Sequence, residues 1–178
     1  MTTTQPDTAT TTERADLLES LAKHRHFLRL TTRDLTDEQA RQRPTASQLC
    51  LGGLIKHVSL GERNWAEFIE HGSTAKLSAT GDLEAAAAAH QTRFQMLEGE
   101  TLAGLLERYE QVARHTDQLV TTLPDLDQSH PLPETPWFEP GARWSARRVL
   151  LHIIAETAQH AGHADIIREA IDGSKSMG

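Results

Sequence analysis

The chain has 178 residues, of which 38% are hydrophobic, and this length and composition suit one domain with its own core. Its formal net charge of -7 argues against a surface that follows nucleic-acid phosphates. The single cysteine, Cys50, excludes an internal disulfide framework. Because no stretch of about 18 apolar residues occurs and the first residues lack the pattern of an export signal, we expect a cytoplasmic protein with no membrane and no nucleic-acid partner.

The chain begins with a tail, one helix and a polar connector. Residues 1–12 are rich in threonine and have little to bury, so we expect a disordered or loosely docked tail before one domain over residues 13–178. Leucines at helical spacing predict a helix from about Thr12 to Leu30, which Thr12 can cap. The polar residues 34–44 predict a connector with one short helical turn.

A second helix is predicted from just after Ser47 to Gly72, which suits a C-cap. His57 falls on the apolar side of this helix. A lone inward histidine is ordinarily a core residue bonded to a backbone carbonyl. A ligand role gains weight here because the last helix carries a second inward polar cluster.

Three glycines lie near His57 in the second helix. Gly52, Gly53 and Gly61 lower its helix propensity by about 1 kcal/mol each. They indicate that another backbone or a ligand approaches closely. Cys50 is expected to be a small core residue rather than a ligand or a reactive thiol.

The middle of the chain predicts a loop, a covering segment and a third helix. Residues 73–80 predict a loop, and residues 82–90 predict a short surface helix. The apolar segment 94–97 is expected to cover the core. A third long helix is predicted from about Thr101 to Leu123, with Thr101 as its N-cap.

A long connection with four prolines is predicted over residues 124–145. Loops of this length in a compact domain are usually functional or disordered. The adjacent aromatic residues Trp137 and Phe138 favour an ordered loop that walls a cleft, and a simple crossover with its tryptophan in the core is an equal alternative. Ser145 is placed to begin the last helix.

The last helix, predicted from Trp144 to Gly173, carries a stripe of titratable residues. Its members are spaced at i, i+4, i+8 and i+11 and are His152, Glu156, His160 and His163. Large aliphatic residues share the stripe, so it faces the interior. Burying these groups without partners would cost several kcal/mol. A single bound metal ion is the simplest partner for all of them. Asp165 and Arg168 are interpreted as a structural ion pair or an interhelical anchor.

Four long helices predict an all-α fold, a four-helix bundle whose core can hold a metal site. Glu156 and His160 lie one turn apart and suit two ligands of one divalent ion, and His57 can supply a third. This set leaves positions for water or substrate, as in catalytic zinc sites. Iron, nickel and manganese suit the same donors. His163 and His152 are candidate reserve ligands, outer partners or proton acceptors.

Two segments resemble a known group of proteins: LGGLIKHVSLGERNW, with the inward His57, and the ending ETAQHAGHADIIREAIDG. The chain resembles the DinB-like superfamily of four-helix bundle metalloproteins over nearly its whole length after the tail. The resemblance is closest to the mycothiol-dependent maleylpyruvate isomerase and mini-circle-type branch. Many members have histidine where this chain has Glu156, whereas the isomerase type has glutamate. Many have glutamine in place of His163.

The resemblance implies that His57, Glu156 and His160 bind the metal, with zinc as the first expectation and nickel or iron as alternatives. It further implies that this metal activates mycothiol or a similar thiol, such as bacillithiol or glutathione. The leading hypothesis is therefore a thiol S-transferase or thiol-dependent isomerase that acts on an electrophilic small molecule. The alternatives are a non-enzymatic metal-holding or ligand-binding bundle and a metal-dependent hydrolase.

Some residues outside the predicted ligand set are candidates to contact the thiol or the electrophile. Arg143 and Trp137, with Phe138, are candidates to contact the cofactor or the substrate. Arg147 and Arg148 are more simply a solvated first turn. An exposed helix face leaves a homodimer open.

Overall fold

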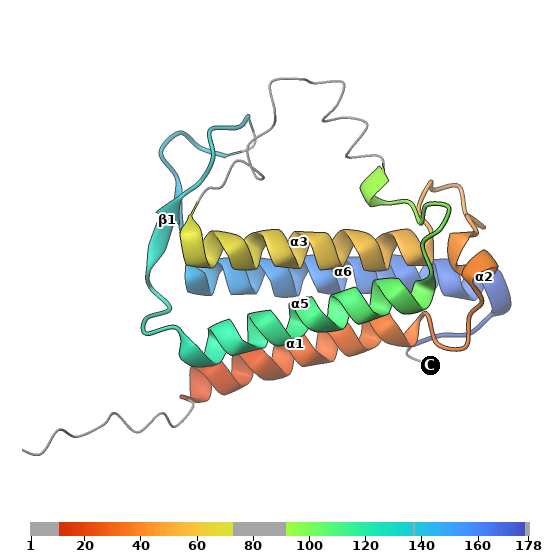
Figure 1. Ribbon diagram of the computed structural model, residues 1–178, viewed down its shortest axis with the longest axis horizontal. Coiled ribbons are helices and arrows are strands. Elements are labelled where there is room, and N and C mark those ends of the chain that lie inside the picture. Colours follow the sequence, from red (N-terminus) through yellow and green to blue (C-terminus); the bar gives the residue numbers. More distant parts are fainter. Residues whose placement is uncertain (1–10, 73–91, 137, 177–178) are drawn as a thin grey trace, which may run out of the picture.

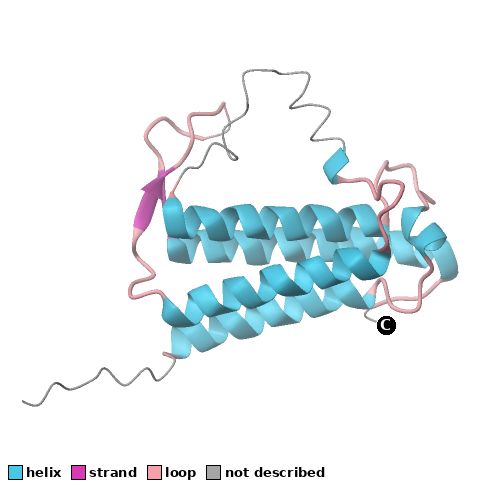
Figure 2. Ribbon diagram, viewed as in Figure 1, coloured by secondary structure: helices cyan, strands magenta, loops and turns pink. Residues whose placement is uncertain are grey.

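The computed structural model describes residues 11–72, 92–136 and 138–176. Helices dominate these residues, and the strands form one small ribbon (Figures 1 and 2). The predicted all-α class is confirmed. The predicted tail up to residue 10, the loop 73–80, the short helix 82–90 and Trp137 lie outside the described residues. The elements are α1 (Thr12–Leu30), α2 (Asp37–Arg41), α3 (Leu51–His71), α5 (Leu102–Thr122), β1 (Ser129–Pro131), β2 (Arg143–Ser145) and α6 (Ala146–Asp172).

The helix boundaries follow local capping. The predicted cap of α1 is wrong by one residue, because the Thr11 side chain accepts from the backbone N–H of Arg14 and Thr12 is already helical. Thr101 caps α5 as predicted, by accepting from the N–H of Gly104 at 3.1 Å. Ser145 caps α6. In each case a side-chain oxygen satisfies an N–H group that the helix leaves without a partner.

The four long helices form a bundle in which neighbours along the chain are not always neighbours in space. The colours of Figure 1 show that α1 and α6 run in one direction and that α3 and α5 run in the other. Contacts join α1 to α6, α6 to α3, α3 to α5 and α5 to α1. Helices α1 and α3 are therefore diagonal, and α3 contacts both α5 and α6. None of the described helices is long and apolar enough to cross a membrane.

The connection between α5 and α6 contains a ribbon that the sequence did not predict. Strands β1 and β2 pair antiparallel, with His130 opposite Trp144. Beyond the ribbon, the N–H of Leu132 donates to the carbonyl of Ala142 at 2.9 Å. Strands of three residues are too short to give a recognisable alternation in the sequence. The predicted ordered connection is thus partly a β-ribbon at the end of the bundle.

A buried polar layer separates two apolar clusters of the core. Arg25 of α1 reaches across the bundle diagonal to Glu62 of α3, with Nη2 2.5 Å from Oε1, and both side chains are almost completely buried. The same guanidinium lies 2.7 Å from Asp117 of α5. These carboxylates raise the pKa of Arg25 against the opposing effect of burial. Tyr109 and Thr157, both fully enclosed, complete the layer from α5 and α6.

The predicted ion pair between Asp165 and Arg168 does not form. Arg168 instead pairs with Asp172 at 2.9 Å and donates to the backbone carbonyls of Thr31 and Arg33. Asp165 accepts hydrogen bonds from Ser176. Arg168 is an interhelical anchor, as predicted. Its partners are backbone carbonyls of the segment that follows α1, and the spacing of residues within α6 cannot reveal them.

Candidate metal centre

Three side chains with metal-binding atoms meet between α3 and α6. One nitrogen from each of His57 and His160 and one carboxylate oxygen of Glu156 lie within 4.8 Å of one another. His160 is buried, whereas His57 and Glu156 are half-buried. The structure thus brings together the three residues that the sequence selected as ligands, although their role in binding metal stays a prediction.

The position of His57 depends on a glycine one turn earlier in α3. A Cβ atom on Gly53 would lie 1.9 Å from the carbonyl oxygen of Phe94, so only glycine allows the segment before α5 to pack here. That contact places the Phe94 ring on the His57 imidazole, with ring centroids 3.9 Å apart and 21° between the planes. The predicted close approach of another backbone is therefore found at Gly53, and it helps to fix a candidate ligand.

His160 is held between an acid and a second imidazole. Its Nε2 atom lies 3.6 Å from Oε2 of Glu156, and its Nδ1 atom lies 3.5 Å from Nδ1 of His163. If His163 accepts at Nδ1, the lone pair on Nε2 of His160 faces the carboxylate and is available to a cation. Burial lowers the pKa of His160, while the charge of Glu156 opposes this shift. The neutral form, which binds metals, is therefore favoured near neutral pH.

The three side chains open onto a cavity of about 170 Å³. Val58, Trp65 and Ile153 give it apolar walls, and Thr157 and Glu62 connect it to the buried polar layer. The remaining lining residues are Gly61, Asn64 and Arg93. Seven of the eleven lining residues are polar or ionisable, so the cavity combines one apolar wall with several convergent polar groups, as small-molecule sites do.

His152 does not line this cavity. Its ring stands edge-on to Trp65 and Trp144, with centroids 5.0 and 5.1 Å away. The two indoles stack on each other at 5.0 Å, and Phe138 packs against Trp144. Burial is the largest cause of the lowered pKa of His152. His152 thus packs in the aromatic cluster one helical turn before Glu156, whose charge acts on it, and supports the wall formed by Trp65.

The arginines considered for cofactor contact lie outside the cavity lining. Arg143 is exposed on β2 and donates to the carbonyl of Ser129 at 2.6 Å, which ties the ribbon together. The Arg147 guanidinium pairs with Glu13 and Asp127. Arg148 lies over the Trp144 ring, 4.2 Å from its centroid. Each of these arginines has a structural partner at the ribbon end of the bundle.

The donor set fits a divalent transition metal. Ligand atoms of one tetrahedral zinc ion are about 3.3–3.6 Å apart, given bonds of about 2.0–2.2 Å. The contact of 3.6 Å between Glu156 and His160 is already close to this spacing, and small rotations would bring His57 within reach. Two neutral imidazoles and one carboxylate are ligands that zinc, nickel and iron accept.

Comparisons with known proteins agree with this fold and identify the family. The family model described as mycothiol-S-transferase matches residues 16–173. The chain belongs to the mycothiol-S-transferase family. This family is part of the DinB-like superfamily, so the resemblance seen in the sequence is confirmed. No curated protein matches the chain.

A solved structure of a conserved protein from Enterococcus faecalis is similar in fold, with a TM-score of 0.64 and 13% sequence identity. The alignment covers 90% of this chain and 97% of that one. At this identity the likeness shows the fold alone.

Sequence reasoning missed two features of this member of the mycothiol-S-transferase family. Glu62 was not considered, although it lines the cavity and pairs with Arg25. A signal was available on the first helix, where Arg25 stands among leucines at i, i+4, i+8 and i+11 from Leu17. The stacking of Phe94 on His57 could not be found in this way, because the two residues lie on segments that meet only in the folded bundle.

Proposed function

We propose that this protein transfers a low-molecular-weight thiol, with mycothiol as the first candidate, to an electrophilic small molecule, and that one divalent metal ion held by His57, Glu156 and His160 assists it. Membership of the mycothiol-S-transferase family supports the thiol and the transfer. The observation that carries the metal is the convergence of two imidazoles and a carboxylate at a small cavity.

Each side chain of the centre has a distinct task in this proposal. A bound divalent cation would supply the positive charge that lowers the pKa of a thiol from about 8.5 toward neutrality. Zinc is the first candidate, with nickel or iron as alternatives. His57 and His160 offer neutral nitrogen lone pairs, and Glu156 offers a negative charge. His163 acts as a positioning residue that fixes the tautomer of His160.

The apolar part of the cavity supports an electrophile with an apolar body. Trp65, Val58 and Ile153 present indole and aliphatic surface beside the ligands. Exclusion of water by these walls would strengthen the electrostatic interactions within the site. It would also protect a reactive thiolate from side reactions.

The test combines metal analysis with a thiol conjugation assay. Protein purified without a histidine tag is analysed by elemental mass spectrometry, and the conjugation of mycothiol to chlorodinitrobenzene is followed by absorbance. We expect about one divalent ion per chain and a conjugation rate that depends on both the metal and the thiol. His57→Ala and His160→Ala should each lose the metal and the rate, while His71→Ala, at an exposed position, should keep both.

Two results would overturn the proposal. Retention of a full complement of metal in both ligand variants would remove the assigned ligand set. A substrate consumed at the same rate without thiol would show a hydrolase instead of a transferase.

A further inference from the structure

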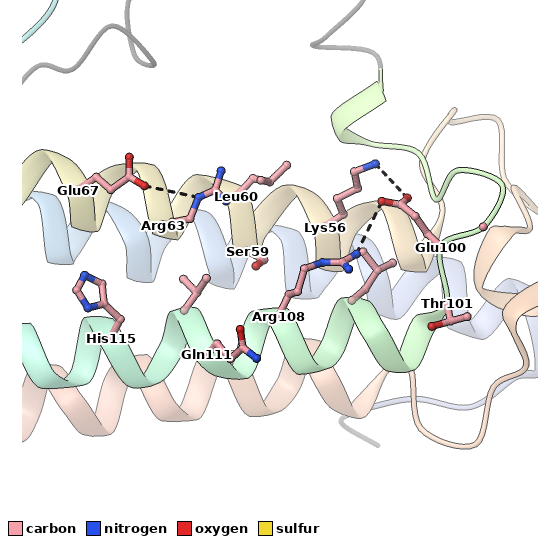
Figure 3. A pocket seen from close by; sticks show the side chains of 13 residues that line it. Lys56, Ser59, Leu60, Arg63, Glu67, Glu100, Thr101, Arg108, Gln111 and His115 are labelled. Atoms are coloured by element: carbon pink, nitrogen blue, oxygen red, sulfur yellow. Dashed lines mark hydrogen bonds and ion pairs between the residues drawn. The ribbon is translucent and has the colours of Figure 1, made fainter.

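A large cavity lies on the side of α3 that faces α5. It is a groove of about 700 Å³, a size common among small-molecule sites. Figure 3 shows Arg63 and Lys56 on its α3 wall and Arg108 and His115 on its α5 wall. None of its lining residues is a candidate metal ligand. The groove is therefore separate from the proposed metal centre, although both share helix α3.

The floor of the groove is apolar and its rim is charged. Leu60, Leu105 and Val112 supply the apolar surface between the two helices. Lys56, Arg63 and Arg108 stand against two glutamates, Glu67 and Glu100, while His115 is paired with Glu70 at 3.0 Å. An excess of one positive charge in the lining, in a chain with a net charge of -7, favours an anionic occupant.

Glu100 has two partners that are closer than Arg108. It lies 3.0 Å from Nζ of Lys56 and accepts from the backbone N–H of Leu97 at 2.8 Å. These contacts lower the pKa of Glu100 although burial opposes them. The nearest approach of Arg108 to this carboxylate is 3.8 Å, and its side chain is 58% exposed. The Arg108 guanidinium therefore keeps most of its donors for another partner.

On the α3 wall, Arg63 has an ion pair that is as long as that of Arg108. Its Nε atom lies 3.8 Å from Glu67, one turn further along α3, and its side chain is 48% exposed. An arginine that precedes its acidic partner in a helix has the less favourable orientation with respect to the helix dipole. Two guanidinium groups from facing helices thus remain available, each with a planar set of donors that matches carboxylate or phosphate oxygens.

We propose that the groove between α3 and α5 binds an organic anion, in which an apolar body lies on Leu60, Leu105 and Val112 and a carboxylate or phosphate group is held by Arg63 and Arg108. This binding does not depend on the metal centre. It gives the protein a second small-molecule site on the other side of α3.

The test uses anilinonaphthalene sulfonate as the anionic probe and phenylnaphthylamine as a nearly identical uncharged probe, both followed by fluorescence titration. We expect saturable one-site binding of the sulfonate. Its Kd should rise about tenfold in Arg63→Gln/Arg108→Gln, which corresponds to the loss of one good charge-assisted hydrogen bond. The uncharged probe should bind this variant and the parent protein equally.

The matched control is Arg33→Gln/Arg114→Gln, which removes the same charge from side chains that are 73% and 64% exposed outside the groove. Its Kd should change less than about twofold. Displacement of the sulfonate by decanoate or by decyl phosphate then identifies the preferred head group. Amide chemical shifts should change along the groove faces of α3 and α5.

Three results would overturn the proposal. One is an absence of saturable binding, and another is an equal loss of affinity in both double variants. The third is a pattern of shift changes centred on His57 and His160, which would place the probe in the metal cavity.

Discussion

The two sides of α3 use polar residues in opposite ways. Toward α6, the buried Glu62 pairs with Arg25 of α1, and His57 packs against Phe94 and His160 beside a cavity of about 170 Å³. Toward α5, Arg63 and Arg108 line a groove of about 700 Å³, and about half of each side chain is exposed to water. A buried polar group needs a fixed partner because water cannot replace it, whereas an exposed group keeps its hydration. Substitutions on the buried side should therefore have the larger effects.

The largest effect is expected from breaking the diagonal ion pair. Glu62→Leu leaves the guanidinium of Arg25 buried with only Asp117 beside it. The free energy of unfolding should fall by about 3–5 kcal/mol, as for other buried pairs that lose one partner. Urea denaturation measures this change.

The double variant Arg25→Met/Glu62→Leu is the control, because it removes both charges and should recover most of the loss. Equal instability of the single and double variants would contradict this account. Arg147→Met, in an exposed pair with Glu13, should have a much smaller effect.

A methyl group on Gly53 should disturb the side of α3 that carries the candidate metal centre and leave the groove toward α5 unchanged. Gly53→Ala pushes against the carbonyl of Phe94 and should destabilise the protein by about 1–3 kcal/mol. It should also weaken metal binding, because the Phe94 ring would leave His57. Thermal unfolding and metal titration measure the two effects. Gly162→Ala, where a Cβ atom meets nothing within 4 Å, should instead stabilise α6 by up to about 1 kcal/mol.

Removing His163, the partner of His160, should lower the metal affinity more than it lowers the stability of the fold. His163→Phe deprives Nδ1 of His160 of its neighbour at 3.5 Å and should lower metal affinity by about 10–100-fold. His163→Gln keeps an acceptor and should restore most of the affinity. Competition with a chelating dye measures both variants. An unchanged affinity in His163→Phe would show that His163 has no positioning role.

The smallest expected effect is the change in folding stability with pH. Burial lowers the pKa of His152 and His160 below the value of 6.5, so the unfolded chain binds protons that the folded chain does not. The metal-free protein should have its full stability above about pH 6.5 and lose stability as the pH falls toward the lowered values. His152→Phe should reduce this dependence, while His71→Phe, at an exposed position, should leave it unchanged. Urea denaturation at several pH values provides the test.

The sequence predicted much of this fold because helical periodicity and capping are local. The limits of α1, α5 and α6 lie within two residues of the predicted ones, since apolar spacing and cap residues such as Thr101 act within one turn. The same local logic placed Glu156 and His160 one turn apart. It failed for the three-residue strands of the ribbon, which are too short to show a pattern.

The sequence by itself placed His57, Glu156 and His160 on the inward faces of their helices and therefore selected them before their geometry was known. Only the tertiary structure decided their neighbours: Phe94 on His57, Glu62 beside the cavity, and Arg25 across the diagonal. The physical reason is that periodicity fixes the direction of a side chain relative to its own helix. The packing of four helices fixes which other side chain it meets, and that information is spread over the whole chain.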